Sequence, residues 1–433
     1  MKLNEIFLSR MKSILTYGFD DFLKSLNNPI VKSIYVNENK ISVQDFKKIV
    51  DFEISPVVYE KAGFYVEDGK KGRHPLHHAG AFYMQEPSAM FTINSLQFNG
   101  DEKVLDMCAA PGGKSIQIAN RIPNGVLVSN EIVKSRCEIL YSNIERMGFK
   151  NVIIANDSPE NIAEAYGNCF DVCVVDAPCS GEGMFRRGED VSNQWNENLD
   201  EMCAIRQLDI LSQADKTLKQ GGKLIYSTCT YSKKENEDVV SEFMNKYGYE
   251  LINIEYPHSK GIDMPQAVRL YPHENKGEGQ FVALLLKKSE NLNSCYSKQK
   301  LTNSKITNDF IKSNTNIKGD MVEYKKYSYF TPCEDLVKKH VNYVSIGVRL
   351  GHIENSRFEP NQNLFTAFGN CFNIKLEYNF SHDNVRKYLR GETLDVDLPD
   401  GFGALMINGC PLGGFKISKS KFKNYYPKGL RNF

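Results

Sequence analysis

The sequence lacks the features that mark metal-bound, secreted or membrane-spanning proteins. Its 11 cysteines include no CxxC pair, so we expect neither a zinc site nor a disulfide framework, and most of the thiols should be reduced and buried. No apolar run approaches the roughly 20 residues that span a bilayer. The opening MKLNEIFLSRMKSIL lacks the apolar core of a signal peptide and is typical of an amphipathic helix. These absences predict a cytoplasmic protein with no membrane partner.

An excess of charge of one sign is also missing. The 433 residues include 54 Lys and Arg against 53 Asp and Glu, a net charge of +1, so any signal for a nucleic-acid partner must be local. The histidines of HPLHH, which are His74, His77 and His78, have no cysteine or acid nearby at ligand spacing. We therefore expect this cluster to bind no metal.

Length and shifts in composition predict several domains. Residues 1–75 combine a helical start with short strands, which predicts a small N-terminal α+β module. Residues 76–288 alternate strand-like and helical segments. Residues 289–326 are rich in Asn, Ser, Thr and Lys and are predicted to be a polar linker. Residues 327–433 alternate short strands with glycine-containing turns, which predicts a small β-rich domain.

Four strand-like segments in the middle of the chain end in an acidic residue, and a helical stretch follows each of them. The acids are Asp106, Glu131, Asp157 and Asp176, separated by 25, 26 and 19 residues, about one βα unit each. The segments GGKLIYSTCT and GQFVALLLKK predict two further strands. This alternation predicts an α/β fold with a doubly wound, mainly parallel sheet. Ligands of such sheets bind beyond the carboxyl ends of the strands, where these acids lie.

The segment DMCAAPGGKS follows the first of these strands and opens a helix. Its glycines, Gly112 and Gly113, let a ligand approach the backbone, and the free N–H groups of a helix start suit a carboxylate. Glu131 suits a ribose diol, and Asp157 can reach the amine of an adenine. Because neither GxGxxG nor GxxxxGK[ST] is present, these groups indicate S-adenosylmethionine. The alternative is a tight turn that binds no ligand.

Two cysteines lie where the fourth and fifth strands end, Cys179 in DAPCSG and Cys229 in YSTCTY. Neighbouring strand ends can bring both thiols to one cleft, because both lie at the binding edge of the sheet. We expect most of the other cysteines to be small buried hydrophobes. These are Cys137, Cys169, Cys173, Cys203, Cys295, Cys333, Cys371 and Cys410.

A thiol, an acid and a methyl donor together suit methylation of carbon 5 of a pyrimidine, which is a poor nucleophile. Addition of a thiolate to carbon 6 makes carbon 5 nucleophilic, so that it can attack the methyl sulfonium. A carboxylic acid beside N3 assists the addition, and Asp176 is placed for that role. A base must later remove the proton on carbon 5, and a second cysteine near the first can help this release.

These segments resemble the motifs of the NOL1/NOP2/Sun family of RNA cytosine-5 methyltransferases. DMCAAPGGKS is similar to the family's cofactor loop, DAPCSGEGMFRR to its fourth motif and YSTCTYSKKENE to its sixth, and QEPSAM and RLYPHENKGEGQFVALL also match. The resemblance implies a Rossmann-like class I methyltransferase domain with S-adenosylmethionine as cofactor. It implies that Cys229 is the nucleophile, that Cys179 assists product release and that Asp176 touches the base. The cofactor-binding residues that it implies are Cys108, Ala109, Ala110, Pro111, Gly112, Gly113, Lys114, Glu131, Asp157 and Asp176.

The C-terminal segment KNYYPKGLR is similar to the ending of the bacterial RsmF (YebU) branch of that family, whose appended domain is PUA-like. This resemblance implies that the substrate is cytosine in small-subunit (16S) ribosomal RNA, free or within the subunit. It also implies RNA-binding roles for the N-terminal module and the C-terminal domain. We expect the protein to be a monomer.

Local charge favours an RNA partner. No acidic residue follows Asp400, and basic and aromatic residues alternate in this tail, where they can track phosphates and stack on splayed bases. We also expect Arg186 and Arg187 to hold substrate phosphates. The alternative for the tail is a solvated basic face. Its basic residues are Lys416, Lys419, Lys421, Lys423, Lys428 and Arg431, and its aromatic residues are Phe415, Phe422, Tyr425 and Tyr426.

Three alternative functions share parts of this pattern. A DNA cytosine-5 methyltransferase has its nucleophile in the PC motif, which would make Cys179 essential and Cys229 dispensable. A non-catalytic RNA-binding assembly factor would keep the fold but lack a catalytic cysteine, whereas both are present here. A transfer-RNA methyltransferase would have identical catalytic motifs, and only the C-terminal domain favours ribosomal RNA.

Overall fold

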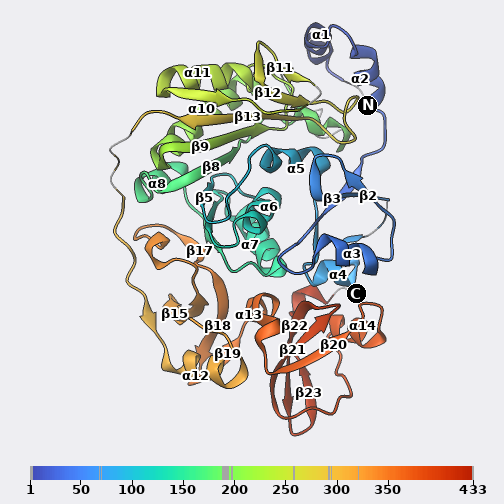
Figure 1. Cartoon of the computed structure of the whole chain (residues 1–433), viewed down its shortest axis with the longest axis vertical. Coiled ribbons are helices and arrows are strands. Elements are labelled where there is room, and N and C mark those ends of the chain that lie inside the picture. Colours follow the sequence, from blue (N-terminus) through green and yellow to red (C-terminus); the bar gives the residue numbers. More distant parts are fainter. Residues whose placement is uncertain are drawn as a thin grey trace.

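Figure 1 shows the computed structural model of the chain, in which the N-terminal module lies beside the central sheet and two C-terminal β sheets lie below both. The structure describes residues 3–67, 69, 71–187, 195–196, 198–256, 259–290, 293, 295–319 and 321–431. Within these ranges, no helix has the length and apolar character needed to cross a bilayer.

The N-terminal module is built on a four-stranded antiparallel sheet with the strand order β2-β3-β1-β4. The predicted N-terminal helix is confirmed as α1, in which Phe7 and Met11 are buried one turn apart and the side chain of Asn4 caps the first turn. The elements are α1 (Glu5–Ile14), α2 (Phe19–Ser25), β1 (Lys32–Val36), α3 (Val43–Ile49), β2 (Ile54–Val57), β3 (Glu60–Val66), α4 (Pro75–His78), β4 (Phe82–Met84) and α5 (Pro87–Asn94).

The central sheet confirms the predicted doubly wound fold. Its strand order is β11-β12-β13-β9-β8-β5-β6-β7-β17, with β10 paired to β13. The five strands from β9 to β7 are parallel, whereas the strands at both edges are antiparallel, so the sheet is parallel at its centre only. The central strands are β5 (Lys103–Asp106), β6 (Val126–Asn130), β7 (Val152–Ala155), β8 (Phe170–Asp176) and β9 (Leu218–Thr228).

Helices cover both faces of this sheet, and antiparallel strands extend it at the β9 edge (Figure 1). Because the central strands are buried on both faces, they are nearly continuous runs of Val, Ile and Leu. The helical elements are α6 (Gly113–Arg121), α7 (Lys134–Met147), α8 (Pro159–Ala165), the 3₁₀ segment η2 (Glu182–Arg187), α10 (Leu199–Thr217) and α11 (Glu237–Tyr247). The further strands are β10 (Tyr249–Ile252), β11 (Lys260–Gly261), β12 (Met264–Leu270) and β13 (Gln280–Lys287).

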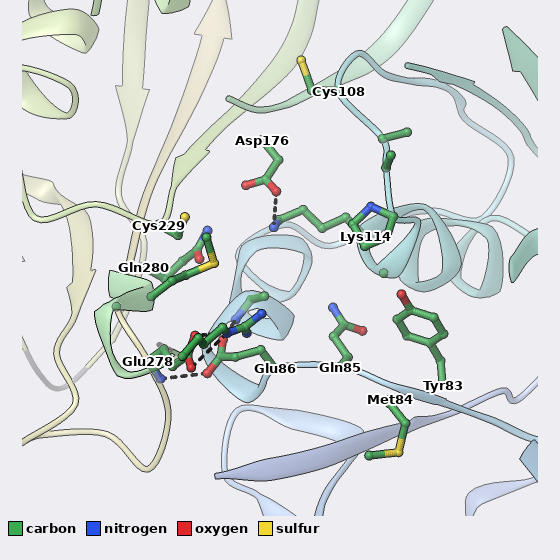
Figure 2. Close-up of a pocket in the computed structure, with 18 residues that line it drawn as sticks. Tyr83, Met84, Gln85, Glu86, Cys108, Lys114, Asp176, Cys229, Glu278 and Gln280 are labelled. Atoms are coloured by element: carbon green, nitrogen blue, oxygen red, sulfur yellow. Dashed lines mark hydrogen bonds and ion pairs between the residues drawn. The ribbon is translucent and has the colours of Figure 1, made fainter. Parts of the chain in front are cut away.

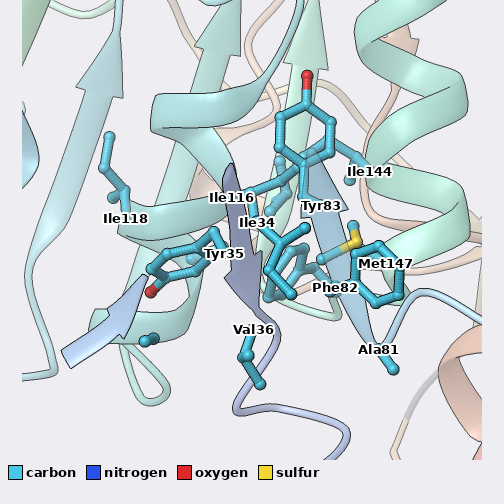
Figure 3. Close-up of a cluster of buried hydrophobic side chains, with 14 of the residues drawn as sticks. Ile34, Tyr35, Val36, Ala81, Phe82, Tyr83, Ile116, Ile118, Ile144 and Met147 are labelled. Carbon is cyan, nitrogen blue, oxygen red and sulfur yellow. The ribbon is translucent and has the colours of Figure 1, made fainter. Parts of the chain in front are cut away.

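The N-terminal module and the central domain share one hydrophobic core (Figure 3). Side chains of β1 and β4, such as Ile34 and Phe82, pack with Ile116 of α6 and Met147 of α7. The buried Asn37 reinforces this contact, because its side-chain amide donates to the carbonyl of Met147 over 2.9 Å. The module therefore fixes the helix that follows the predicted cofactor loop.

Two sheets follow the central domain. The first has the strand order β14-β15-β16-β18-β19, and the second has the order β20-β21-β22-β23. The elements of the first are β14 (Thr302–Asn303), α12 (Lys305–Asn314), β15 (Met321–Tyr324), β16 (Tyr327–Phe330), β18 (Val348–Glu354) and β19 (Arg357–Pro360). Those that follow are α13 (Gln362–Phe368), β20 (Ile374–Tyr378), α14 (Asp383–Leu389), β21 (Gly401–Ile407), β22 (Cys410–Ser418) and β23 (Lys421–Asn424).

The segment predicted to be a polar linker, residues 289–326, differs from that expectation. It contains β14, α12 and β15, and α12 buries Thr307 and Ile311. Its polar residues lie mostly on the outer faces of these short elements, which is why composition alone favoured a linker. A further short strand, β17 (Tyr343–Ser345), pairs with β7 and joins the C-terminal part to the central sheet.

The aromatic residues of the C-terminal tail do not form the predicted stacking surface. Phe415, Phe422 and Tyr426 are buried in the core, and the Phe415 and Phe422 rings stack on each other with their centroids 5.1 Å apart. The alternation of a strand explains this result, because β23 turns Phe422 inward and its neighbours Lys421 and Lys423 outward. The lysines at the two ends of this alternation are exposed, so a basic face without stacked aromatic residues describes this part of the tail.

Lys40 joins three parts of the chain. Its ammonium group donates to the carbonyls of Ala79 in the N-terminal module, Arg146 at the end of α7 and Pro411 in β22, over 2.6, 3.2 and 3.3 Å. Burial lowers the pKa of Lys40 to about 7, since no carboxylate accompanies these acceptors. The contact between the C-terminal sheet and the rest of the molecule therefore includes a titratable group.

We expect the wild type to gain stability relative to Lys40→Met as the pH rises from 7 to 9. In this range the unfolded chain keeps the amine protonated, with a pKa of about 10.4, while the folded chain releases the proton. The unfolded state then binds more protons, so the free energy of unfolding rises with pH, by at most about 1.4 kcal/mol per pH unit. Urea unfolding at pH 7, 8 and 9 measures this difference. The exposed Lys48→Met serves as control, and a pH-independent difference for Lys40→Met would contradict the prediction.

Candidate active site

A cavity of about 250 Å³ lies at the carboxyl edge of the central sheet (Figure 2). The loop between β5 and α6 forms one wall and contributes six of the seven predicted loop residues. Gly113 starts α6 where a Cβ atom would lie 3.2–3.3 Å from the side chains of Gln85 and Tyr83, so the loop packs closely on the N-terminal module. The six are Cys108, Ala109, Ala110, Pro111, Gly113 and Lys114, and Gly112 is outside the lining.

Asp176 lies in this cavity at the end of β8 and is held by two donors (Figure 2). The Lys114 ammonium lies 2.7 Å from one carboxylate oxygen, and the Ser227 hydroxyl donates to the other over 2.7 Å. Ser227 is the register partner of Asp176 on β9, so the parallel pairing itself supplies this donor. The arrangement holds a carboxylate and an ammonium group in contact at the cavity wall.

Asp106 lies behind the loop and is completely buried. One carboxylate oxygen accepts from Ser115 over 2.7 Å, and the other has no hydrogen-bond partner among the described residues. Burial raises the pKa of Asp106 to about 7, while the Ser115 hydrogen bond opposes that rise. The site thus retains an unused acceptor beside the loop.

The two singled-out cysteines meet at this edge. The sulfur atoms of Cys179 and Cys229 are 3.2 Å apart, because the residues follow the neighbouring strands β8 and β9. Cys229 lines the cavity together with Asp176 and Lys114. The pKa of the Cys179 thiol is raised well above its ordinary value, first by its hydrogen bond with Cys229 and second by burial. Cys179 is therefore a protonated thiol at neutral pH.

Two predicted cofactor residues lie outside the lining of this cavity. Glu131 is buried at the end of β6, where its carboxylate accepts from the backbone of Val133 and lies 3.5 Å from Arg136. Asp157 accepts from Asn161 and from the backbone of Asn342 over 2.7 and 3.0 Å. Their roles as ribose and adenine contacts stay predictions.

Several lining residues were not predicted as site residues. Glu86 caps α5 and also accepts the backbone N–H of Glu278 over 2.8 Å. Burial, together with the charge of Glu278, raises the pKa of Glu86. Glu86 lies in QEPSAM and Glu278 in RLYPHENKGEGQFVALL, so these two motifs could have indicated that both residues belong to the site. The unpredicted lining residues include Tyr83, Gln85, Glu86, Met184, Glu278 and Gln280.

The two arginines after Cys179 have different surroundings from those predicted. Arg186 donates to the carbonyls of Ser25 and Gly277, so it joins α2 to the loop before β13. Arg187 lines the cavity and donates to the Glu278 carboxylate over 3.0 and 3.1 Å. The expectation that both arginines bind phosphate stays a prediction, and in this structure the Arg186 guanidinium donates to backbone carbonyls.

A parallel central sheet with a glycine-containing loop, a carboxylate and paired thiols at its carboxyl edge defines a Rossmann-like methyltransferase. The family model described as 16S rRNA methyltransferase RsmB/F matches residues 93–286. The models of the N-terminal domain of 16S rRNA methyltransferase RsmF and of the methyltransferase RsmF PUA domain match residues 3–87 and 375–432. The chain belongs to the NOL1/NOP2/Sun family, in its RsmF branch.

Curated relatives match between two thirds and nearly all of the chain. A ribosomal RNA small subunit methyltransferase F from Enterobacter sp. (strain 638) is 29% identical over 98% of this chain and 95% of its own length. A protein of the same name from Vibrio vulnificus (strain YJ016) is 36% identical over 66% of this chain and 64% of its own length. Among solved structures, a methyltransferase homolog protein from Pyrococcus horikoshii matches with a TM-score of 0.59 and 29% identity, covering 66% of this chain and 95% of that one. These matches confirm the predicted fold class and the enzyme class.

The surroundings of Cys179 lead to a test of thiol reactivity. Because the pKa of Cys179 is raised, its thiolate fraction at pH 8 is small, and alkylation by iodoacetamide should be at least about tenfold slower than at the exposed Cys295. Cys295 is a suitable reference because it is an exception to the predicted burial of the remaining cysteines. Peptide mass spectrometry after timed quenching measures both rates. Equal rates would contradict the protonated state assigned to Cys179.

Proposed function

We propose that the chain transfers a methyl group from S-adenosylmethionine to carbon 5 of cytosine in 16S ribosomal RNA, through a covalent bond between Cys229 and carbon 6. The observation that carries this proposal is the convergence of Cys229, Cys179 and Asp176 at the end of two paired strands, beside the loop predicted to bind the cofactor. Family membership and the names of the curated relatives support the substrate.

The loop residues fit a cofactor of this chemistry. The start of α6 offers free backbone N–H groups for a carboxylate, and the buried Asp106 retains an unused acceptor for an ammonium group. Glu131 would hold the ribose and Asp157 the adenine amine. S-adenosylmethionine supplies the methyl group as an electrophilic sulfonium.

The side chains divide the reaction between them. The Cys229 thiolate adds to carbon 6, and the new charge on the ring develops at N3 and O2. Asp176 and the Lys114 ammonium group, which lie 2.7 Å apart, would be next to this position and stabilise that charge. After methylation a base removes the proton from carbon 5, the bond between Cys229 and carbon 6 breaks, and Cys179 assists this release.

Several further statements belong to the same proposal. The lysines on the outer face of β23 and the N-terminal module would bind RNA outside the cavity. We place the active protein in the cytoplasm as a monomer, acting on small-subunit RNA. We propose that the last division, residues 327–433, acts as a unit of function and carries the PUA match. The predicted boundary at residue 75 divides the sheet β2-β3-β1-β4, and residues 289–326 are part of the folded C-terminal half.

The central test is methyl transfer from labelled S-adenosylmethionine to unmodified 16S RNA, assembled small subunits, transfer RNA and DNA. We expect label as 5-methylcytosine in ribosomal RNA only and its loss in Cys229→Ala, because the proposed adduct forms on the Cys229 sulfur atom. Cys179→Ala should accumulate a covalent RNA adduct, seen as a band of reduced mobility in a denaturing gel. Label in transfer RNA would mean that transfer RNA and not ribosomal RNA is the substrate, with the same mechanism. Label in DNA that persists in Cys229→Ala would overturn the mechanism.

The pairing of Lys114 with Asp176 gives a second test. We expect Lys114→Met to lower kcat by roughly 10²-fold or more, because the ammonium group that would stabilise the charge on the ring is lost. Lys134→Met, at the start of α7 and outside the cavity, is the matched control and should keep the wild-type rate. Single-turnover methylation with saturating cofactor measures both rates. A wild-type rate in Lys114→Met would remove this pair from the mechanism.

A further inference from the structure

The backbone on both sides of each site cysteine is held by buried polar side chains from α10 and the loop before α11. The segment YSTCTYSKKENE contains these residues after Cys229, and the proposed reaction gives Glu235 and Asn236 no role. Both side chains are completely buried. Buried polar groups of this kind are stabilising only when their hydrogen bonds are satisfied, so their partners show what they position.

Glu235 and Gln207 hold the segment around Cys179. The Ser180 backbone N–H donates to the Glu235 carboxylate over 2.9 Å, and the Ser180 hydroxyl also donates to it. Gln207 donates to the Pro178 carbonyl over 3.0 Å and to Glu235 over 2.9 Å. The residues immediately before and after Cys179 are therefore both fixed. Burial raises the pKa of Glu235 to about 7.

Asn236 holds the segment around Cys229 in the same way. The Thr228 hydroxyl donates to the Asn236 side-chain oxygen over 2.5 Å, and the Asn236 amide donates to the Thr230 carbonyl over 3.0 Å. The residues on both sides of Cys229 are thus fixed by one side chain, and this side chain is the sequence neighbour of Glu235.

A hydrogen bond between the two segments completes the arrangement. The hydroxyls of Ser180 and Thr230, the residues that follow the two cysteines, are 2.8 Å apart. Tyr226 of β9 donates to the Glu235 carbonyl over 2.5 Å, so Glu235 is also tied to the strand that leads to Cys229. The sulfur atoms, which are 3.2 Å apart, contact each other at the open end of this network.

We propose that Glu235 is a positioning residue that holds the Cys179 segment against the Cys229 segment, so that the second thiol is in reach when the methylated RNA is released. The inference rests on the proposed division of roles between the two cysteines. Loss of the Glu235 carboxylate frees the Ser180 N–H and hydroxyl and lets Cys179 move away. An error of about 1 Å in such a contact can lower a rate by roughly 10²-fold.

The variants separate position from charge. Glu235→Ala removes both acceptors, whereas Glu235→Gln keeps a carbonyl for Ser180 and Gln207 and an amide that can donate to the Ser180 hydroxyl. Both variants lack the negative charge, so a difference between them reports the hydrogen bonds and packing of the side chain and not its charge. Glu102→Ala is the matched control, since Glu102 is also buried and accepts two backbone N–H groups, at the start of β5 away from the cavity.

The first measurement uses the rate of disulfide formation to report how close the two sulfur atoms lie, and it needs no RNA. Diamide oxidises two neighbouring thiols to a disulfide and takes up their two protons and two electrons, becoming the hydrazine. We expect the Cys179–Cys229 disulfide to form in Glu235→Gln and Glu102→Ala at rates near the wild type, and at least about tenfold more slowly in Glu235→Ala. Peptide mass spectrometry of quenched samples measures the rate. Equal rates in Glu235→Ala and Glu235→Gln would overturn the proposal.

The second measurement follows release. Glu235→Ala should lower kcat and accumulate the covalent RNA adduct, as Cys179→Ala does, with the KM for S-adenosylmethionine unchanged, and Glu235→Gln should restore turnover. If Glu235→Ala does not fold, Gln207→Ala removes the bond to Pro178 and should change both readouts in the same direction. If Cys179→Ala forms no adduct, the proposed roles of the two cysteines in the reaction are refuted. The rates of disulfide formation would still test whether Glu235 positions Cys179 against Cys229. Normal release in Glu235→Ala, with adduct in Cys179→Ala, would overturn the proposal.

Discussion

The parallel pairing of β8 with β9 is the constraint on which the site depends. It aligns Asp176 with Ser227 and thereby sends Cys179 and Cys229, 50 residues apart in sequence, out of the sheet at the same point. The 3₁₀ segment that follows Cys179 then runs so close to Cys229 that the Gly183 N–H donates to the Cys229 carbonyl over 2.8 Å. A Cβ atom at Gly183 would lie 2.8 Å from that carbonyl, so only glycine allows this approach.

The sequence was sufficient for the parts of the site that local patterns encode. Strands ending in an acid predicted where Asp176 would lie, and strand ends predicted that Cys179 and Cys229 would meet. The alternation in KFKNYY also predicts that Phe422 faces inward, whereas composition alone predicts an exposed aromatic residue, and the structure follows the alternation. Composition likewise predicts a linker where the structure has β14, α12 and β15, because short elements with polar outer faces have the composition of a linker.

Other features depend on contacts between distant segments, which no local pattern reports. Asp157 accepts from the backbone of Asn342, 185 residues away, and the side chain of Lys40 reaches the carbonyl of Pro411, 371 residues away. The fixed position of Glu86 against Glu278 is likewise a tertiary contact across 192 residues. Each of these contacts joins a polar side chain to a backbone group, and backbone groups have no signature in the sequence.

The N-terminal module forms part of the wall of the candidate active site, in addition to the RNA-binding role proposed for it. Its strand β4 carries Tyr83 and continues directly into Gln85 and Glu86, which face the cofactor loop across the cavity in Figure 2. The same strand shares the core of α6 and α7, so the module cannot move without disturbing the loop. Under the proposed function, an RNA bound to the module would therefore be held in a fixed position relative to Cys229. Flipping a cytosine out of its stack costs a few kcal/mol. RNA contacts on a module that is rigidly joined to the cavity can offset that cost where the base enters.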